Sequence, residues 1–85
     1  MPVYEVFLER RAERDLKRLP PDVFQRIIPF LKALSQDPKP AGCRKLVGSK
    51  NDWRIRVGDY RIIYEIDTKE KTVSVMRVRH RKDAY

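Results

Sequence analysis

Residues 53–64 read WRIRVGDYRIIY, two runs of alternating apolar and basic residues joined by a Gly-Asp pair. Glycine adopts the positive φ that a tight two-residue turn requires, so this segment predicts a β-hairpin with its turn at Gly58 and Asp59. Antiparallel pairing about that turn sets Arg56 opposite Arg61. Because successive side chains of a strand point to opposite faces, the hairpin has one apolar and one basic face.

The two faces of this hairpin predict different roles. The apolar face carries Trp53, Ile55, Val57, Tyr60, Ile62 and Tyr64, and the basic face carries Arg54, Arg56 and Arg61. The aromatic residues share their face with the isoleucines, which favours core packing over the alternative that they stack on nucleic-acid bases. Like charges placed opposite each other destabilise a sheet, so the arginine face indicates an anionic ligand, and phosphate is the natural one.

The charge of the chain supports this interpretation. Among 85 residues, 20 are Lys or Arg and 12 are Asp or Glu, for a formal net charge of +8. Residues 43–85 hold 12 basic and 6 acidic residues, whereas residues 1–42 hold 8 and 6. Such asymmetry favours binding to nucleic acid or to a very acidic protein. The alternative is a basic surface that only keeps the protein in solution.

Length and composition limit the protein class. A chain of 85 residues predicts a single domain, residues 1–85, with one small core. The lone Cys43 excludes an internal disulfide and fits the reducing cytoplasm. No signal peptide and no run of about 20 apolar residues is present, so we expect no membrane association. One His and one Cys make no metal-ligand cluster, and we expect no metal and no cofactor.

Two helices are predicted between a first strand and the hairpin. Residues 3–8 are β-branched and aromatic, and apolar residues then recur at helical spacing over residues 9–19. A Pro-Pro pair ends this helix and opens a second one, whose apolar stripe ends at Leu34. Pro29 lies inside that stripe and predicts a kink near Gln25 rather than two helices.

The rest of the chain completes a sheet. Residues 44–46 fit either a short edge strand or a basic loop. The third strand is expected to end at Ile66 and the fourth to span residues 72–79, with Arg77 opposite Arg61 and a register uncertain by one residue. We therefore predict an α+β (α/β) fold: an N-terminal strand, a helical hairpin, and a three-stranded antiparallel meander packed on the helices. The opposite face of the meander is expected to be open to solvent or a ligand.

This pattern resembles the RelE/ParE superfamily of toxins from toxin–antitoxin modules. The resemblance rests on ERRAERDLKRLP at residues 9–20, Lys45-Leu46, the hairpin at residues 53–64, and VRHRKDAY at residues 78–85. It implies the RelE-like fold and one of two activities. RelE-like members are ribonucleases that cut mRNA in the ribosomal A site, whereas ParE-like members poison DNA gyrase. It also implies a separately encoded, acidic, partly disordered antitoxin and a toxin–antitoxin hetero-oligomer.

Site residues follow from the same resemblance. Arg61 would bind the scissile phosphate, Arg81 would support it, and Tyr85 would stack on a base or orient the substrate. Further phosphate contacts are expected from Arg54, Arg56, Arg44, Lys45, Arg77 and Lys82. Arg54 and Arg56 stand where RelE-like sequences commonly carry lysines, and arginine is too basic to act as a general base.

His80 is the candidate for proton transfer, because histidine is the side chain that ordinarily titrates near neutral pH. The alternative is an exposed tail residue without catalytic duty. The favoured function is a ribosome-dependent, metal-independent mRNA endonuclease acting on ribosomes in the cytoplasm. A ParE-like gyrase inhibitor and a noncatalytic RNA-binding module, or a decayed toxin that keeps its partner, remain alternatives.

Overall fold

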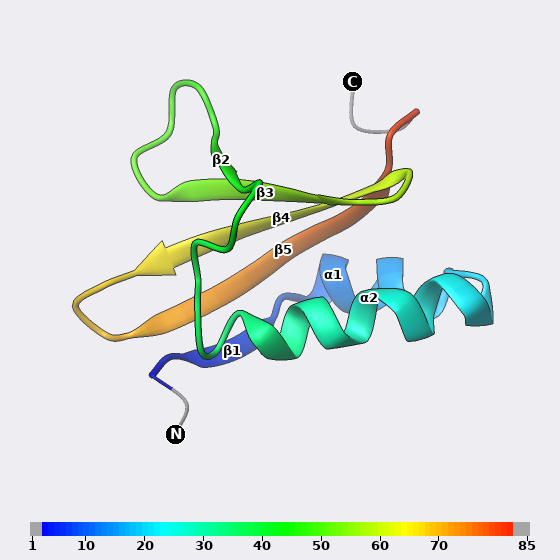
Figure 1. Ribbon diagram of the computed structural model, residues 1–85, viewed down its shortest axis with the longest axis horizontal. Helices are drawn as coiled ribbons and strands as arrows, with labels where there is room; N and C mark the ends of the chain where they lie inside the picture. Colours follow the sequence, from blue (N-terminus) through cyan, green and yellow to red (C-terminus); the bar gives the residue numbers. More distant parts are fainter. Residues whose placement is uncertain (1–2, 83–85) are drawn as a thin grey trace.

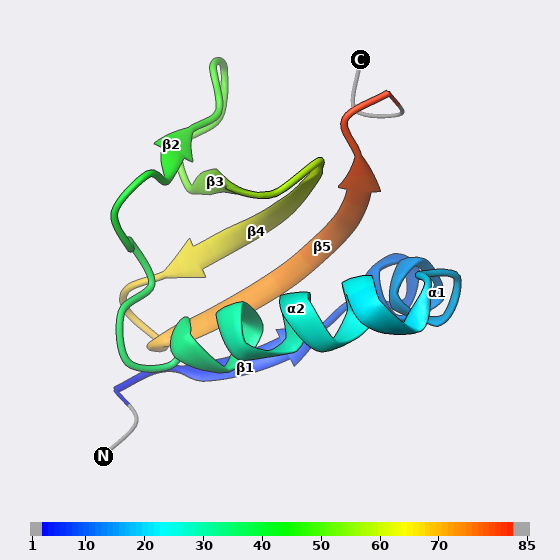
Figure 2. The ribbon, with the colours of Figure 1, turned by 45° about the vertical axis from the view of Figure 1, so that its right-hand side comes forward.

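One strand, two helices and four further strands follow one another along residues 3–82, the part of the chain that the computed structural model describes (Figure 1). They are β1 (Glu5–Leu8), α1 (Arg10–Lys17), α2 (Pro21–Ala33), β2 (Arg44–Lys45), β3 (Asp52–Val57), β4 (Tyr60–Asp67) and β5 (Thr72–His80). The five strands form one sheet, and both helices cover the same face of it (Figures 1 and 2). The predicted α+β class is confirmed, and residues 44–45 are an edge strand rather than a loop.

The central hairpin has the predicted register. Val57 lies opposite Tyr60, Arg56 opposite Arg61, and Trp53 opposite Tyr64. Gly58 adopts a φ of 59°, the left-handed conformation that a turn of this kind requires and that side-chain-bearing residues rarely adopt. The turn therefore sets which hairpin side chains face the helices.

The apolar face of the hairpin packs into the core. Ile55, Val57, Ile62 and Tyr64 are buried, and Trp53 and Tyr60 are half-buried against the same cluster. Helices α1 and α2 complete the core with Ala12, Leu16, Ile27, Leu31 and Leu34. Burial confirms core packing for Ile55, Val57, Ile62 and Tyr64, whereas the rings of Trp53 and Tyr60 stay partly accessible at the edge of the core.

Tyr64 links this core to the segment that follows α2. Its side chain is fully buried, and its hydroxyl donates a 2.8 Å hydrogen bond to the carbonyl oxygen of Pro38. Burial raises the pKa of the Tyr64 phenol well above its usual value, and Cys43 and Asp37 add smaller contributions in the same direction. The neutral phenol therefore fixes the path of the chain from α2 to β2.

Strand β1 occupies a position that the linear pattern does not indicate. The sheet order is β1-β5-β4-β3-β2, and β1 pairs with β5 in parallel, with Val6 opposite Val73. The strand begins at Glu5, two residues later than predicted. Helix α2 is a single helix with Pro29 inside it, as predicted. No helix of residues 3–82 is long and apolar enough to cross a membrane.

The predicted register of the last strand is wrong. Strand β4 continues to Asp67, which pairs with Thr72, and an irregularity between Ile63 and Tyr64 then shifts the pairing. Arg77 consequently lies opposite Ile63 rather than opposite Arg61. A β-bulge of this kind adds one residue to one strand and exchanges the faces of all residues beyond it.

Asp15 of α1 fixes the part of β5 that β1 leaves uncovered, because β1 ends opposite Val75. One carboxylate oxygen of Asp15 accepts hydrogen bonds from the Val78 backbone N–H and the Arg77 Nε, both at 2.9 Å, and the other accepts from an Arg77 guanidinium nitrogen at 3.3 Å. The carboxylate thus replaces a neighbouring strand at this edge.

Candidate nucleic-acid interface

Arginines form rows across the sheet face that the helices leave uncovered. Arg56, Arg61 and Arg79 are direct neighbours on β3, β4 and β5, and Arg44 lies opposite Arg54 on β2 and β3. The alternation of the hairpin places all of them on one side of the sheet. We call these five residues the arginine face. Like charges in register cost stability, and a bound anion would offset this cost.

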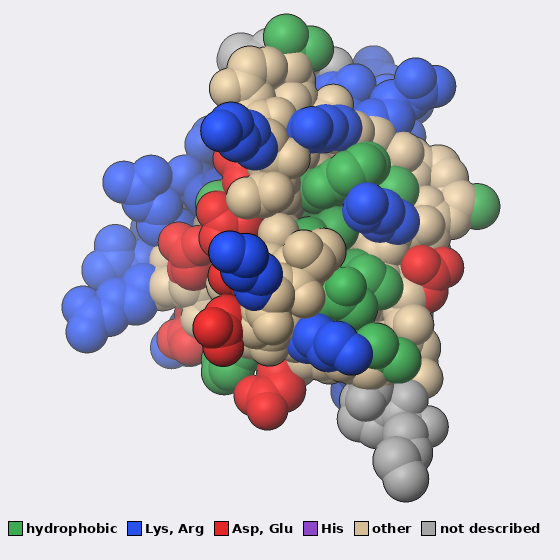
Figure 3. Space-filling view, turned by 90° about the vertical axis from the view of Figure 1, so that its left-hand side faces the viewer, with side chains coloured by type: hydrophobic (Ala, Val, Ile, Leu, Met, Phe, Trp, Pro, Cys, Tyr) green, Lys and Arg blue, Asp and Glu red, His purple; other side chains and the backbone are tan. Residues whose placement is uncertain are grey.

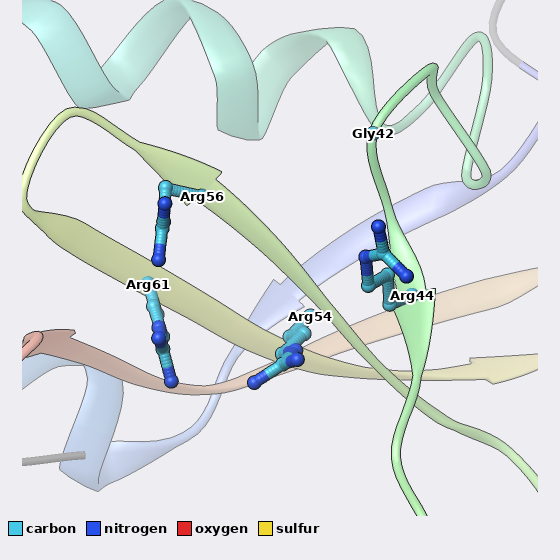
Figure 4. A pocket seen from close by; sticks show the side chains of 5 residues that line it. All are labelled: Gly42, Arg44, Arg54, Arg56 and Arg61. Carbon is cyan, nitrogen blue, oxygen red and sulfur yellow. The ribbon is translucent and has the colours of Figure 1, made fainter.

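A cavity of about 330 Å³ opens on the arginine face and is lined by Gly42, Arg44, Arg54, Arg56 and Arg61. Figure 4 shows Arg54, Arg56 and Arg61 extending from β3 and β4, with Arg44 approaching from β2. Guanidinium groups offer planar, forked donors that match phosphate oxygens. The cavity is therefore suited to a phosphate group and its neighbouring sugar.

A second cavity, also of about 330 Å³, adjoins the first. Arg56, Arg61, Arg81 and Lys82 line it, so Arg56 and Arg61 border both cavities. The Arg81 backbone N–H donates a 2.7 Å hydrogen bond to the Asp59 carbonyl oxygen, which attaches the end of the described chain to the hairpin turn. This bond explains how Arg81 reaches Arg61 in space. The structure thus brings together Arg44, Arg54, Arg56, Arg61, Arg81 and Lys82.

The side chain of Arg61 is far less exposed to solvent than a side chain on an open sheet face would be. Its exposure is 7 %, and among residues 3–82 it is the one charged side chain in the buried class. Arg56 beside it is exposed. The expectation of a fully open face is therefore wrong at Arg61, because β4 lies in the middle of the sheet, with Arg56 on one side and Arg79 on the other. Reduced hydration strengthens the attraction between this guanidinium and a bound anion.

Charge changes sign along the same face. Near the β4–β5 turn, the strands carry Glu65 opposite Asp52, and Asp67 follows two residues later. Figure 3 shows acidic side chains gathered in one region, with lysine and arginine side chains beside them as well as projecting beyond them. The positive potential on this face is therefore strongest at the end that carries the Gly58 turn.

Two of the predicted phosphate contacts lie elsewhere. Lys45 is exposed on β2 but pairs with Trp53, so it belongs to the opposite face of the sheet. Arg77 is half-buried in its ion pair with Asp15 and lines neither cavity of the arginine face. This ion pair holds α1 against β5.

His80 is also placed away from the arginine face. It pairs with Tyr60, the two rings meet edge to face with centroids 5.1 Å apart, and its Nδ1 accepts a 3.2 Å hydrogen bond from the Lys82 backbone N–H. The histidine lines a different cavity, beside α1. Tyr85 falls outside the described residues, and its expected role stays a prediction.

Sequence reasoning missed Arg79 as a member of the arginine face. The alternation of side chains along β5 is the pattern that bears on its placement, but the β-bulge reverses the face that each residue occupies beyond Val75. No group of three or more His, Cys, Asp or Glu side chains that could hold a metal ion occurs within residues 3–82. The basic side chains that line the two cavities carry guanidinium and ammonium groups.

Replacing Arg56 by threonine should raise the free energy of unfolding by about 0.5 kcal/mol, since it removes a like-charge pair with Arg61. Threonine also favours strands, so Lys45→Thr is the matched control, because Lys45 faces Trp53 instead. Urea unfolding at low salt measures both. An equal change in the free energy of unfolding of the two variants would show that the strand propensity of threonine, and not the removal of like charge, is responsible.

Comparison with known proteins agrees with these features. The family described as "ParE toxin of type II toxin-antitoxin system, parDE" matches residues 6–85. Toxin RelG of Mycobacterium tuberculosis is 37% identical over 86 residues, covering 96% of this chain and 95% of that protein. Putative toxin RelE1 of Methanocaldococcus jannaschii is 26% identical, covering 96% and 94%.

Solved structures share the fold. The RelBE2 toxin–antitoxin complex from M. tuberculosis contains a chain with a TM-score of 0.81 and 33% identity, covering 94% of this chain and 99% of that one. The archaeal RelE–RelB complex from Pyrococcus horikoshii gives a TM-score of 0.83 at 28% identity, covering 95% and 98%. On this sequence and structural agreement, the protein belongs to the RelE/ParE superfamily, as a toxin of the ParE toxin family of type II toxin–antitoxin systems.

Proposed function

We propose that this toxin is a RelE-like endoribonuclease that cleaves mRNA in the ribosomal A site in the cytoplasm. The observation that carries the proposal is the Arg56–Arg61 pair between two cavities lined by basic residues. The similarity of this chain to Toxin RelG and to chains of RelB–RelE complexes supports the RelE-like branch of the superfamily. A single RNA strand, unlike a closed duplex, can present one phosphate to this pair and its flanking phosphates to both cavities.

The residues of the site suit charge stabilisation. Cleavage through the 2′-hydroxyl builds negative charge on the phosphorane, and preorganised cations at that point lower the barrier. We assign Arg61 to a non-bridging oxygen of the scissile phosphate and Arg81 to its support. Arg54 and Arg44 would hold a neighbouring phosphate. Because His80 lies beside α1, we leave it out of proton transfer.

Ribosome and gyrase assays test this proposal. Purified toxin should cut mRNA on programmed ribosomes and leave gyrase-mediated DNA cleavage unchanged. The family description names ParE toxins, which makes a gyrase inhibitor the second candidate. Gyrase trapped on DNA with intact ribosome-bound mRNA would reject the RelE-like activity. Ribosome binding without cutting would identify a noncatalytic RNA-binding module or a decayed toxin.

We further propose an acidic antitoxin segment as the partner that covers the arginine face. RelE-type chains of known structure occur in complexes with RelB antitoxins, and the net charge of +8 suits an acidic partner. A segment that folds on binding would shield the neighbouring arginines from one another and would block the RNA site at the same time. The toxin would then be stored as a hetero-oligomer.

Hydrogen exchange of the complex should show slower exchange over residues 42–51 and 80–82. These backbone segments border the arginine face outside its central strands, so their amides report coverage. The β4–β5 turn, residues 68–71, lies at the other end of the sheet, serves as the internal control and should be unchanged. Protection of that turn without protection of residues 42–51 and 80–82 would contradict an antitoxin on the arginine face.

A further inference from the structure

A third cavity lies at the edge of β5, between its last residues and the end of α1, and Arg79 of the arginine face borders it. Its volume is about 210 Å³, and Arg18, Leu19, Tyr60, Arg79 and His80 are among the residues that line it. It shares no lining residue with the two cavities of the arginine face. The proposed phosphate site leaves it unexplained.

The charge of this cavity is positive. Asp15 and Arg77 also line it, but their ion pair, completed by the Val78 backbone N–H, balances the aspartate. Arg18, exposed where α1 ends, and the half-buried Arg79 add two further positive charges. A negatively charged group is therefore the ligand that this lining attracts.

The cavity also offers a directed donor and an aromatic wall. His80 Nδ1 accepts the Lys82 backbone N–H, so the neutral imidazole carries its proton on Nε2 and donates from there. Tyr60 and His80 meet edge to face with an interplanar angle of 87°. Guanidinium groups beside aromatic rings are the combination with which proteins hold the phosphate and base of single-stranded RNA.

This cavity also lies in line with the arginine face. Arg79 pairs across the sheet with Arg61, and Arg81 and Lys82, directly after His80, line the second cavity of that face. The end of β5 therefore separates two basic surfaces by the width of one strand. An RNA strand that leaves the arginine face past Arg61 and Arg79, away from Glu65 and Asp67, would meet this cavity.

We propose that this cavity is a second nucleotide-binding site for the same RNA strand, several nucleotides from the scissile phosphate. Arg18, Arg79 and the Nε2 donor of His80 contact its phosphate, and the Tyr60–His80 ring pair contacts its base. The proposal rests on the proposed ribonuclease function, because it takes the strand at the arginine face to be RNA.

RNA length separates the two sites. Fluorescently labelled 2′-O-methyl oligouridylates, which cannot be cut through the 2′-hydroxyl, serve as probes: a dinucleotide and a strand of about ten nucleotides. Arg18→Ala should weaken binding of the longer strand by about fivefold and lower its log–log salt slope by about 0.7, the contribution of one phosphate contact. Dinucleotide binding should not change, because a dinucleotide fills the arginine face alone.

Three further variants make the comparison specific. Arg14→Ala is the matched control, since Arg14 is an exposed arginine on the same helix and lines none of these cavities. His80→Ala should weaken the longer strand, and His80→Gln should restore part of the affinity because an amide can donate in place of Nε2. Urea midpoints of all four variants show whether each remains folded.

The outcomes distinguish this site from the proposed function. If Arg18→Ala and His80→Ala bind the longer strand as tightly as Arg14→Ala does, the second site is overturned. If they weaken only the binding of the antitoxin, the cavity is a protein interface, and the proposal is equally overturned. Failure of the proposed function appears elsewhere, as dinucleotide binding that does not change in Arg61→Ala.

Discussion

Arg61→Ala is expected to lower the rate of mRNA cleavage on ribosomes by about 100-fold or more, because it removes a cation aimed at charge that develops in the transition state. Arg61 borders both cavities of the arginine face and is 7 % exposed, so its guanidinium is held in place before RNA binds. Single-turnover cleavage with saturating toxin measures the chemical step without the effect of product release.

Stability must be followed in the same variants. Truncation of a buried arginine loses packing, whereas relief of the like-charge neighbours Arg56 and Arg79 gains stability, so we expect a net change within about 1 kcal/mol. Arg61→Lys keeps the charge without the forked donors and should fall between wild type and alanine. Arg11→Ala, an exposed helix position, is the control. Full cleavage by a folded Arg61→Ala protein would overturn the site.

Tyr64→Ala is expected to have the largest effect on folding, a loss of about 3–5 kcal/mol in the free energy of unfolding. The ring is fully buried at the centre of the core, so truncation leaves a cavity. Tyr64→Phe keeps the ring and loses only the hydrogen bond to the Pro38 carbonyl, which should cost about 1 kcal/mol. Urea unfolding measures both. Similar losses in the two variants would show that the hydrogen bond, not packing, dominates.

The same tyrosine predicts alkaline sensitivity. Burial raises the pKa of Tyr64 above the value of about 10 that it has in the unfolded chain. Between these two values the unfolded chain releases a proton that the folded protein keeps, so stability is lost as the pH rises above about 10. The stability advantage of wild type over Tyr64→Phe should therefore shrink above pH 10 and stay constant below pH 9. A constant difference at all pH values would contradict an ionisation-resistant phenol.

Much of the architecture follows from local sequence alone. Residues 53–64 specify their own hairpin, because a two-residue turn with glycine fixes the register and alternation fixes the faces. For the same reason Arg54, Arg56 and Arg61 could be assigned to one face before any tertiary contact was known. Helix α2 likewise follows from its apolar period and the Pro21 start, with Pro29 tolerated inside it.

The tertiary structure decided the features that depend on contacts between distant segments. The bulge opposite Ile63 and Tyr64 set Arg79, not Arg77, beside Arg61, because a β-bulge leaves no periodic signal in the strand that carries it. The ion pair between Asp15 and Arg77 likewise exists only because α1 packs along the edge of β5, far from it in the sequence.

Position within the sheet decided the rest. The central location of β4 buried Arg61, and the parallel pairing of β1 with β5 depended on the crossover through both helices. His80 and Arg81 line different cavities, because His80 pairs with Tyr60 as the last residue of β5 whereas Arg81 bonds to Asp59 of the hairpin turn. The sequence by itself determined the hairpin turn, the alternation of side chains along the strands and the apolar period of the helices, which are properties of neighbouring residues. Burial and register between remote strands arise only when the free energy of the whole packed sheet is minimised.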